Sequence, residues 1–132
     1  MTPHELDELV RRWEAIVDEV ARGYDLTLDD YLNDMDLRER IARALTDDAT
    51  DPPGAPHHGR PRSARRDERT ESRLAGADAR FHELTVPTGP IWGAPVAADE
   101  GHDPAHQWWY FRRPANPGPE LARDLADAKL LD

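Results

Sequence analysis

The sequence predicts a mainly α-helical fold: a small single-domain bundle of three to four helices, with an irregular extended segment or a short β-hairpin near residues 85–113. Three observations support this prediction. The chain has 132 residues, which suits one domain spanning residues 1–132. Apolar residues recur at helical spacing in several stretches. Between these stretches, prolines and glycines mark segments that do not continue a helix.

The segment 3–46 carries the clearest helical pattern. Apolar residues recur every three or four positions from Leu6 to Val20, which predicts one helix with a buried stripe. Gly23 suits its end, because glycine accepts the left-handed conformation that terminates helices. Thr27 and the acids that follow it are typical of a second helix start. This second region could be one bent helix or two short helices.

Residues 46–63 are predicted to form a flexible linker, because they are rich in Pro, Gly and His and offer almost nothing to bury. From residue 64 to 132 we expect a helix, an aromatic-rich extended segment and a C-terminal helix from about Glu120. The first of these helices is indicated by apolar residues at helical spacing, namely Leu74, Ala77, Phe81 and Leu84.

Two short apolar runs follow the third helix, at residues 90–96 and 107–112. Both are rich in aromatic and β-branched residues, so we expect them to pair as strands around the polar loop 97–106. Pro90 and Pro95 would confine the first strand to an edge, because proline cannot donate a backbone hydrogen bond.

Composition excludes several classes of protein. The chain has no cysteine, which excludes disulfides, zinc–thiolate sites and thiol nucleophiles. No apolar run approaches the roughly 18 residues of a membrane span, and residues 1–5 lack the pattern of a secretory signal. We therefore expect a soluble cytoplasmic protein that does not contact a membrane. Lys129 is the only lysine among 17 basic residues, a bias typical of GC-rich bacterial coding.

Motifs of the common enzyme classes are also missing. The sequence has no phosphate-binding glycine loop, no nucleophile elbow and no H-E-x-x-H pair. Its two serines, Ser63 and Ser72, lie in or beside the predicted linker, which argues against a serine triad. These absences favour a non-enzymatic protein that needs no cofactor.

The most unusual string in the sequence is a run of aromatic residues followed by arginines, which is the candidate partner-binding site. Tryptophan, tyrosine and arginine are enriched at the energetic centres of protein interfaces. The alternative is that these aromatics fill the core of a small domain. The string consists of Trp108, Trp109, Tyr110, Phe111, Arg112 and Arg113.

Three histidines form a second candidate site. His102 and His106 are four residues apart, and His82 could approach from the third helix. Imidazoles together with a carboxylate suit zinc or another transition metal. The alternative is that all three are ordinary surface histidines, because the loop around Pro104 does not hold a histidine pair on one helix face.

The net charge of −10 is concentrated near the start of the chain, where residues 1–47 hold 13 of the 27 acids. An acidic helical face attracts a basic partner and disfavours nucleic acid, whose phosphates need positive potential. The arginines of residues 60–73 could instead fold back on this acidic block. The leading hypothesis is therefore an acidic adaptor, inhibitor or antitoxin-like protein. The alternatives are a small metal-binding protein or metal-dependent enzyme, and an accessory structural subunit of an oligomer. The helix at residues 3–22 could also be the contact of a homo-oligomer.

Overall fold

The computed structural model describes residues 3–49 and 60–130, with side chains described for residues 4–46 and 68–130. Residues 50–59, most of the predicted linker 46–63, lie outside this range. The described part holds five α-helices, one 3-10 helix and two short strands, which confirms the mainly helical fold with a small hairpin-like pair. In chain order they are α1 (Pro3–Ala21), α2 (Leu28–Ala49), α3 (Arg60–Leu84), β1 (Thr85–Pro87), α4 (Ala94–Glu100), η1 (Trp108–Phe111), β2 (Arg112–Pro114) and α5 (Pro119–Asp127).

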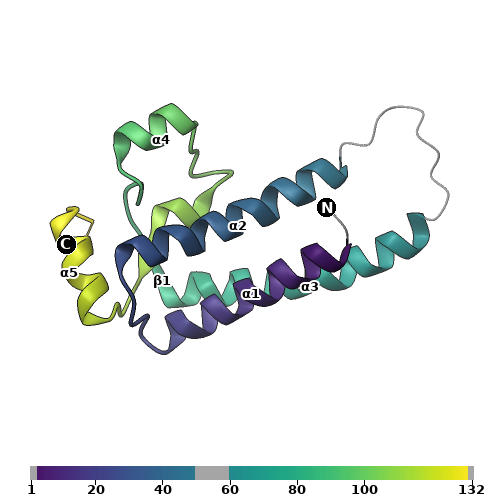
Figure 1. Cartoon of the computed structure of the whole chain (residues 1–132), viewed down its shortest axis with the longest axis horizontal. Helices are drawn as coiled ribbons and strands as arrows, with labels where there is room; N and C mark the ends of the chain where they lie inside the picture. Colours follow the sequence, from purple (N-terminus) through teal and green to yellow (C-terminus); the bar gives the residue numbers. More distant parts are fainter. Residues whose placement is uncertain (1–2, 50–59, 131–132) are drawn as a thin grey trace.

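Helices α1, α2 and α3 are the long elements of the fold, and α1 packs along both of the others (Figure 1). The apolar stripe of α1 is buried within the chain, because its members are each less than a tenth exposed, except Ile16, which is partly buried against the core. That stripe is therefore not a free surface for a second copy, as self-association through residues 3–22 would require. Its buried members are Leu6, Leu9, Val10, Trp13, Val17 and Val20.

The turn between α1 and α2 follows the predicted signals. Gly23 has a φ of +107°, a conformation that side chains rarely adopt. Thr27 then caps α2. Its hydroxyl accepts a hydrogen bond from the Asp30 backbone N–H at 3.2 Å, and the Asp30 carboxylate accepts one from the Thr27 N–H at 3.3 Å. These reciprocal bonds form a capping box at the start of α2, and α2 extends to Ala49 as one helix rather than two.

The strands do not lie where the sequence analysis placed them. The prediction of paired strands at 90–96 and 107–112 is wrong: β1 precedes the first run, β2 begins at Arg112, the last residue of the second, and the two pair antiparallel with Val86 opposite Arg113. Pro95 instead occupies the first turn of α4, a position where its missing N–H costs nothing. The aromatic run forms the 3-10 helix η1 instead of a strand, and its adjacent residues Trp109 and Tyr110 are both buried in the core.

One hydrophobic core joins these elements, and aromatic rings occupy its centre. The Trp13 ring of α1 lies 5.0 Å from that of Phe81 in α3, and Phe81 in turn lies 5.8 Å from Trp108 in η1. Helix α5 also contributes to this core, because its Leu121 and Leu125 are completely buried. Throughout the described ranges, no helix is both long and apolar enough to cross a membrane.

Candidate functional site

The aromatic string predicted as a partner-binding site belongs to the core. Trp109 and Tyr110 are 2% and 3% exposed, and Trp108 and Phe111 are partly buried against the same core. The Tyr110 hydroxyl donates a hydrogen bond to Asp36 of α2 at 2.7 Å. The alternative interpretation of this string, as core filling, is the one that the burial supports, so these aromatics offer a partner little surface.

The two arginines that end the string donate hydrogen bonds mainly to backbone carbonyl oxygens in and next to the strands. The Arg112 guanidinium donates to the Thr85 hydroxyl at 2.8 Å, and to the carbonyl oxygens of Thr85 and His82 at 2.8 and 3.1 Å. The Arg112 carbonyl accepts a hydrogen bond from the buried Tyr31 hydroxyl at 2.7 Å. Arg113 donates to the carbonyl of Pro114. Arg112 thus ties η1 and β2 to the end of α3, a structural role.

The three histidines have separate partners. The His82 ring lies 4.4 Å from Trp108, and the His102 ring is stacked 4.2 Å from Tyr110. His106 is exposed and bonded to Asp103. Burial and the nearby Arg112 charge lower the pKa of His82 below its ordinary value. Within the part of the chain that the structure describes, no group of three His, Asp or Glu side chains could hold a metal ion.

Part of the predicted acidic face of α1 is occupied by arginines of α3. Arg73 pairs with Asp7 at 2.6 Å and with Glu14, and Arg80 pairs with Asp18 at 2.8 Å. The prediction that the arginines of residues 60–73 could fold back on the acidic block agrees with the contacts of Arg73, whereas Arg80 lies beyond that segment. As a result, much of the negative charge of α1 is compensated within the chain.

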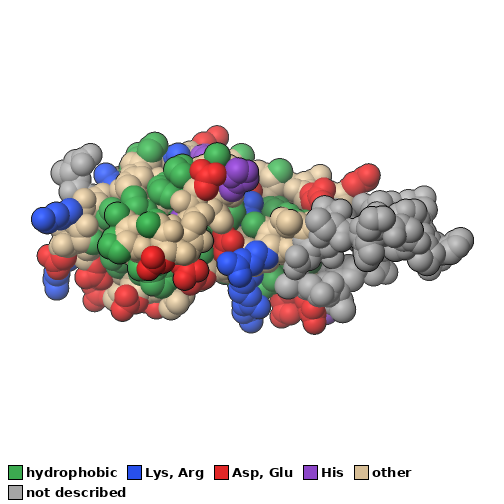
Figure 2. Space-filling view, turned by 90° about the horizontal axis from the view of Figure 1, so that it is seen from above, with side chains coloured by type: hydrophobic (Ala, Val, Ile, Leu, Met, Phe, Trp, Pro, Cys, Tyr) green, Lys and Arg blue, Asp and Glu red, His purple; other side chains and the backbone are tan. Residues whose placement is uncertain are grey.

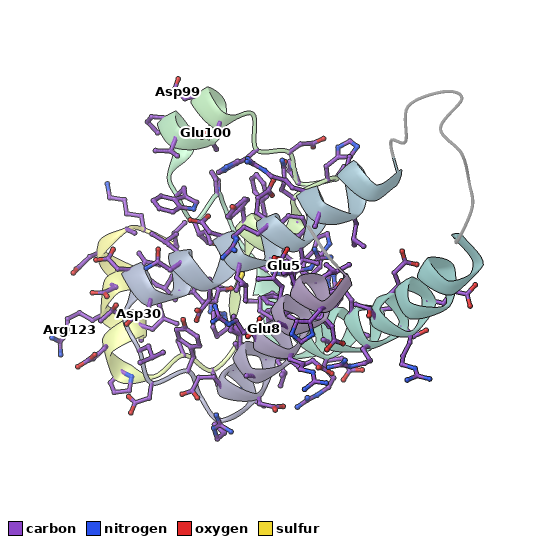
Figure 3. All side chains as sticks on the ribbon, turned by 45° about the vertical axis from the view of Figure 1, so that its right-hand side comes forward. Glu5, Glu8, Asp30, Asp99, Glu100 and Arg123 are labelled. Carbon is purple, nitrogen blue, oxygen red and sulfur yellow. The ribbon has the colours of Figure 1, made fainter. Side chains whose placement is uncertain are left out.

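Negative charge without such compensation gathers where the α1–α2 turn meets α5. The α5 side chain of Asp124 accepts a hydrogen bond from the Leu28 N–H at 3.0 Å, and the Gly118 N–H donates to the Tyr24 carbonyl at 3.3 Å. These contacts place the start of α2 beside α5 (Figure 3). We call this region the acidic end and define it by six carboxylates, those of Asp25, Asp29, Asp30, Glu120, Asp124 and Asp127.

Two further aspartates of α2 are held by tyrosines. The Tyr24 hydroxyl donates a hydrogen bond to Asp34, as Tyr110 does to Asp36. Burial raises the pKa of Asp34, although the hydrogen bond from Tyr24 opposes this effect. Burial and the adjacent carboxylate raise the pKa of each tyrosine, so both hydroxyls keep their protons and remain donors.

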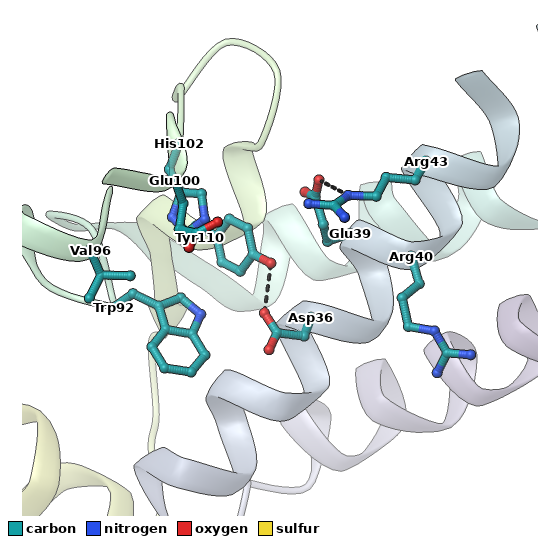
Figure 4. A pocket seen from close by; sticks show the side chains of 9 residues that line it. All are labelled: Asp36, Glu39, Arg40, Arg43, Trp92, Val96, Glu100, His102 and Tyr110. Atoms are coloured by element: carbon teal, nitrogen blue, oxygen red, sulfur yellow. Dashed lines mark hydrogen bonds and ion pairs between the residues drawn. The ribbon is translucent and has the colours of Figure 1, made fainter. Parts of the chain in front are cut away.

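A pocket of about 380 Å³ lies between α2 and the segment 92–102 (Figure 4). One wall is apolar and aromatic, with Trp92 and Val96. The opposite wall is a polar face of α2. Tyr110 lies between the two walls, with the His102 ring stacked on it. Apolar, acidic and basic side chains all reach the surface on this side of the molecule (Figure 2). The lining residues are Asp36, Glu39, Arg40, Arg43, Trp92, Val96, Glu100, His102 and Tyr110.

No protein-family model matches this chain. Searches of curated proteins and of solved structures found no similar protein either.

Two polar atoms in the pocket lining lack partners. Glu39 Oε2 and His102 Nδ1 are buried and make no hydrogen bond, while the other Glu39 oxygen binds Arg43 Nε at 3.2 Å. A buried polar atom without a partner costs free energy, so such atoms are rare in folded proteins. Both atoms are enclosed by protein, so they lie below the surface of the pocket rather than on it.

Sequence reasoning missed this pocket because its walls are far apart in the chain. The sequence predicts a strand at residues 90–96, which include Trp92 and Val96, and gives no signal that this segment faces α2. One signal was available: Asp36, Glu39, Arg40 and Arg43 recur at helical spacing, which puts four polar side chains on one face of α2.

Proposed function

We propose that the protein is a non-catalytic interaction module that binds a partner with a basic surface through the acidic end. The observation that carries this proposal is the distribution of cations. Arg38, Arg73 and Arg80 are used in ion pairs between helices. The acidic end, by contrast, presents six carboxylates, with Arg123 and Lys129 as the cations of α5 and the turn after it.

The geometry supports recognition by charge. Asp25, Asp29 and Glu120 are exposed, and none has an ion-pair partner among the described residues. Carboxylates that lie close together make the electrostatic potential of a surface strongly negative, and this speeds the approach of a positively charged protein. Such attraction is screened by salt over about 8 Å at physiological ionic strength, so the complex should weaken as salt rises.

This proposal keeps the predicted partner, a protein with a basic surface, but moves the contact from the aromatic string to the acidic end. Because Trp109 and Tyr110 are buried, the aromatic string does not supply the apolar part of the interface. Exposed apolar side chains elsewhere, Leu26 in the α1–α2 turn and Val96 in α4, are 40% and 38% exposed. Leu26 is next to Asp25, so it adds apolar area to the acidic end itself.

The proposal is tested by affinity capture from a native lysate at low and high salt. The test variant D25N/D29N/E120Q removes three exposed carboxylates of the acidic end. The control variant E8Q/E71Q/E83Q removes three exposed carboxylates from α1 and α3. Both variants change the net charge equally.

We expect a protein that wild type and control capture at low salt, that high salt releases, and that the test variant fails to capture. Equal capture by the two variants would contradict the proposal. So would a partner whose binding does not depend on salt.

A further inference from the structure

The pocket between α2 and the segment 92–102 carries an inference that does not depend on the acidic end. We propose that it binds a guanidinium group. Three of its lining side chains are carboxylates, those of Asp36, Glu39 and Glu100, and Tyr110 leaves one Asp36 oxygen free. A ligand that satisfies them must be rich in N–H donors and positively charged.

The acceptors come from different directions. Glu39 and Asp36 lie on α2, whereas Glu100 ends α4 on the opposite side of the pocket (Figure 4). A guanidinium carries five donors fanned out in one plane, whereas an ammonium carries three on a single atom. The planar group can therefore reach acceptors on both walls at once.

The Trp92 indole favours the same ligand. Guanidinium groups are weakly hydrated and stack on aromatic rings, with Trp the best platform. The chain already contains one example of this arrangement, since the Arg38 guanidinium lies 4.6 Å over the Trp109 ring and binds the Asp78 carboxylate. The pocket repeats this combination of tryptophan and carboxylate at the surface.

The two arginines of the lining lie at its edge. Arg43 is 74% exposed and approaches Glu39 from the mouth, while Arg40 points away from Trp92 (Figure 4). Arg40 has no ion-pair partner among the residues that the structure describes. Its charge opposes a bound cation, so its removal should strengthen binding. An anionic ligand would show the opposite response to this change.

The guanidinium can belong to a free guanidino compound or to an arginine side chain of a protein. The test therefore uses three single-residue probes that differ only in the side chain: the acetylated and amidated forms of arginine, lysine and citrulline. Citrulline keeps the shape of arginine but lacks its charge. Methylguanidine and an acetyl-Gly-Arg-Gly-amide peptide then separate the two sources. Binding is followed by shifts of the tryptophan indole resonances and by calorimetry.

We expect the arginine probe to shift the Trp92 indole resonance and to bind at least about fivefold more tightly than the lysine or citrulline probe. Binding of the peptide assigns the site to protein arginines, and binding of methylguanidine alone assigns it to free compounds. An equal affinity for arginine and citrulline would overturn the proposal. So would a preference for lysine, or no binding of any guanidinium probe.

Matched variants locate the site. E100Q and W92L should each weaken the arginine probe about fivefold or more, because they remove a charged acceptor and the stacking surface. D99N is the control, since Asp99 neighbours Glu100, is exposed and does not line the pocket. R40Q should tighten binding. Loss of binding in D99N equal to that in E100Q would place the ligand elsewhere. Weaker binding in R40Q would show that the ligand is an anion rather than a cation.

Discussion

Asp78 binds the Arg38 guanidinium through both carboxylate oxygens, with nitrogen–oxygen distances of 3.0 and 2.9 Å. The same carboxylate accepts a hydrogen bond from the Trp13 indole at 2.9 Å. One side chain of α3 therefore holds both α1 and α2. The side chain of Arg38 is only 8% exposed, which makes this pair the most buried ion pair among the described residues.

Replacement of Asp78 should be strongly destabilising. D78N leaves the Arg38 charge buried without a counterion, and we expect the free energy of unfolding to fall by about 3 kcal/mol in urea titrations. R38M/D78N should recover part of this loss, because it removes the unpaired charge. E83Q, an exposed change on the same helix, should stay within about 0.5 kcal/mol of wild type. A D78N protein as stable as E83Q would contradict this account.

The cap that Asp124 provides for α2 should be measurable by itself. D124A removes the acceptor for the Leu28 N–H and should lower stability by about 1 kcal/mol. D127A is the matched control, because it makes the same change on α5 at an exposed residue. Thermal unfolding of both variants measures the difference. Equal stabilities would show that the Leu28 N–H needs no cap from α5.

Two glycines should respond in opposite directions to alanine. A Cβ at Gly118 would lie 2.8 Å from the Tyr24 carbonyl oxygen and 3.2 Å from the Asp25 Cα, both backbone atoms. G118A should therefore cost about 1–3 kcal/mol. At Gly76 of α3 a Cβ meets nothing within 4 Å, so G76A should stabilise by about 0.5–1 kcal/mol. Differential scanning calorimetry tests both: an unchanged or higher melting temperature for G118A would refute the first prediction, and a lower one for G76A would refute the second.

The Tyr24–Asp34 pair should make stability depend on pH. Burial raises the folded-state pKa of Asp34 above the ordinary value of 3.8. The folded protein therefore holds this proton more tightly than the unfolded chain does. The stability contributed by the protonated group is complete below pH 3.8 and is lost as pH rises through the folded pKa.

D34N removes this titration. Relative to wild type, D34N should gain stability as pH rises from below 3.8 toward neutrality, in urea titrations at a series of pH values. D25N is the control for loss of an exposed carboxylate at the same end of the molecule. A difference between D34N and wild type that is constant over this range would show that the Asp34 pKa is not raised.

The long helices could be predicted from sequence because each carries its own evidence. The α1 stripe from Leu6 to Val20 and the Thr27–Asp30 cap are local patterns, and the structure confirms both. The α3 stripe that ends at Leu84 likewise identified a helix despite Gly76. In these stretches, local spacing and tertiary packing favour the same conformation.

The region after α3 could not be predicted in the same way. Residues 108–111 are apolar at every position, so their spacing does not distinguish a strand from a helical turn. What decides the conformation is tertiary packing: Tyr110 and Trp109 are buried against Asp36 and Arg38 of α2, and Trp108 contacts Phe81 of α3. The pocket has the same origin, since Trp92 reaches α2 only through the irregular path of residues 88–93.

The hydrogen bond between Leu28 and Asp124 spans 96 positions of the chain. On a ribosome that makes about 5–20 residues per second, α2 is finished several seconds before the carboxylate that caps it exists. The same delay applies to Gly118, which packs against the α1–α2 turn. The first two helices therefore reach their final arrangement only after Asp124 has been made, and chaperones that bind the nascent chain have that interval in which to act.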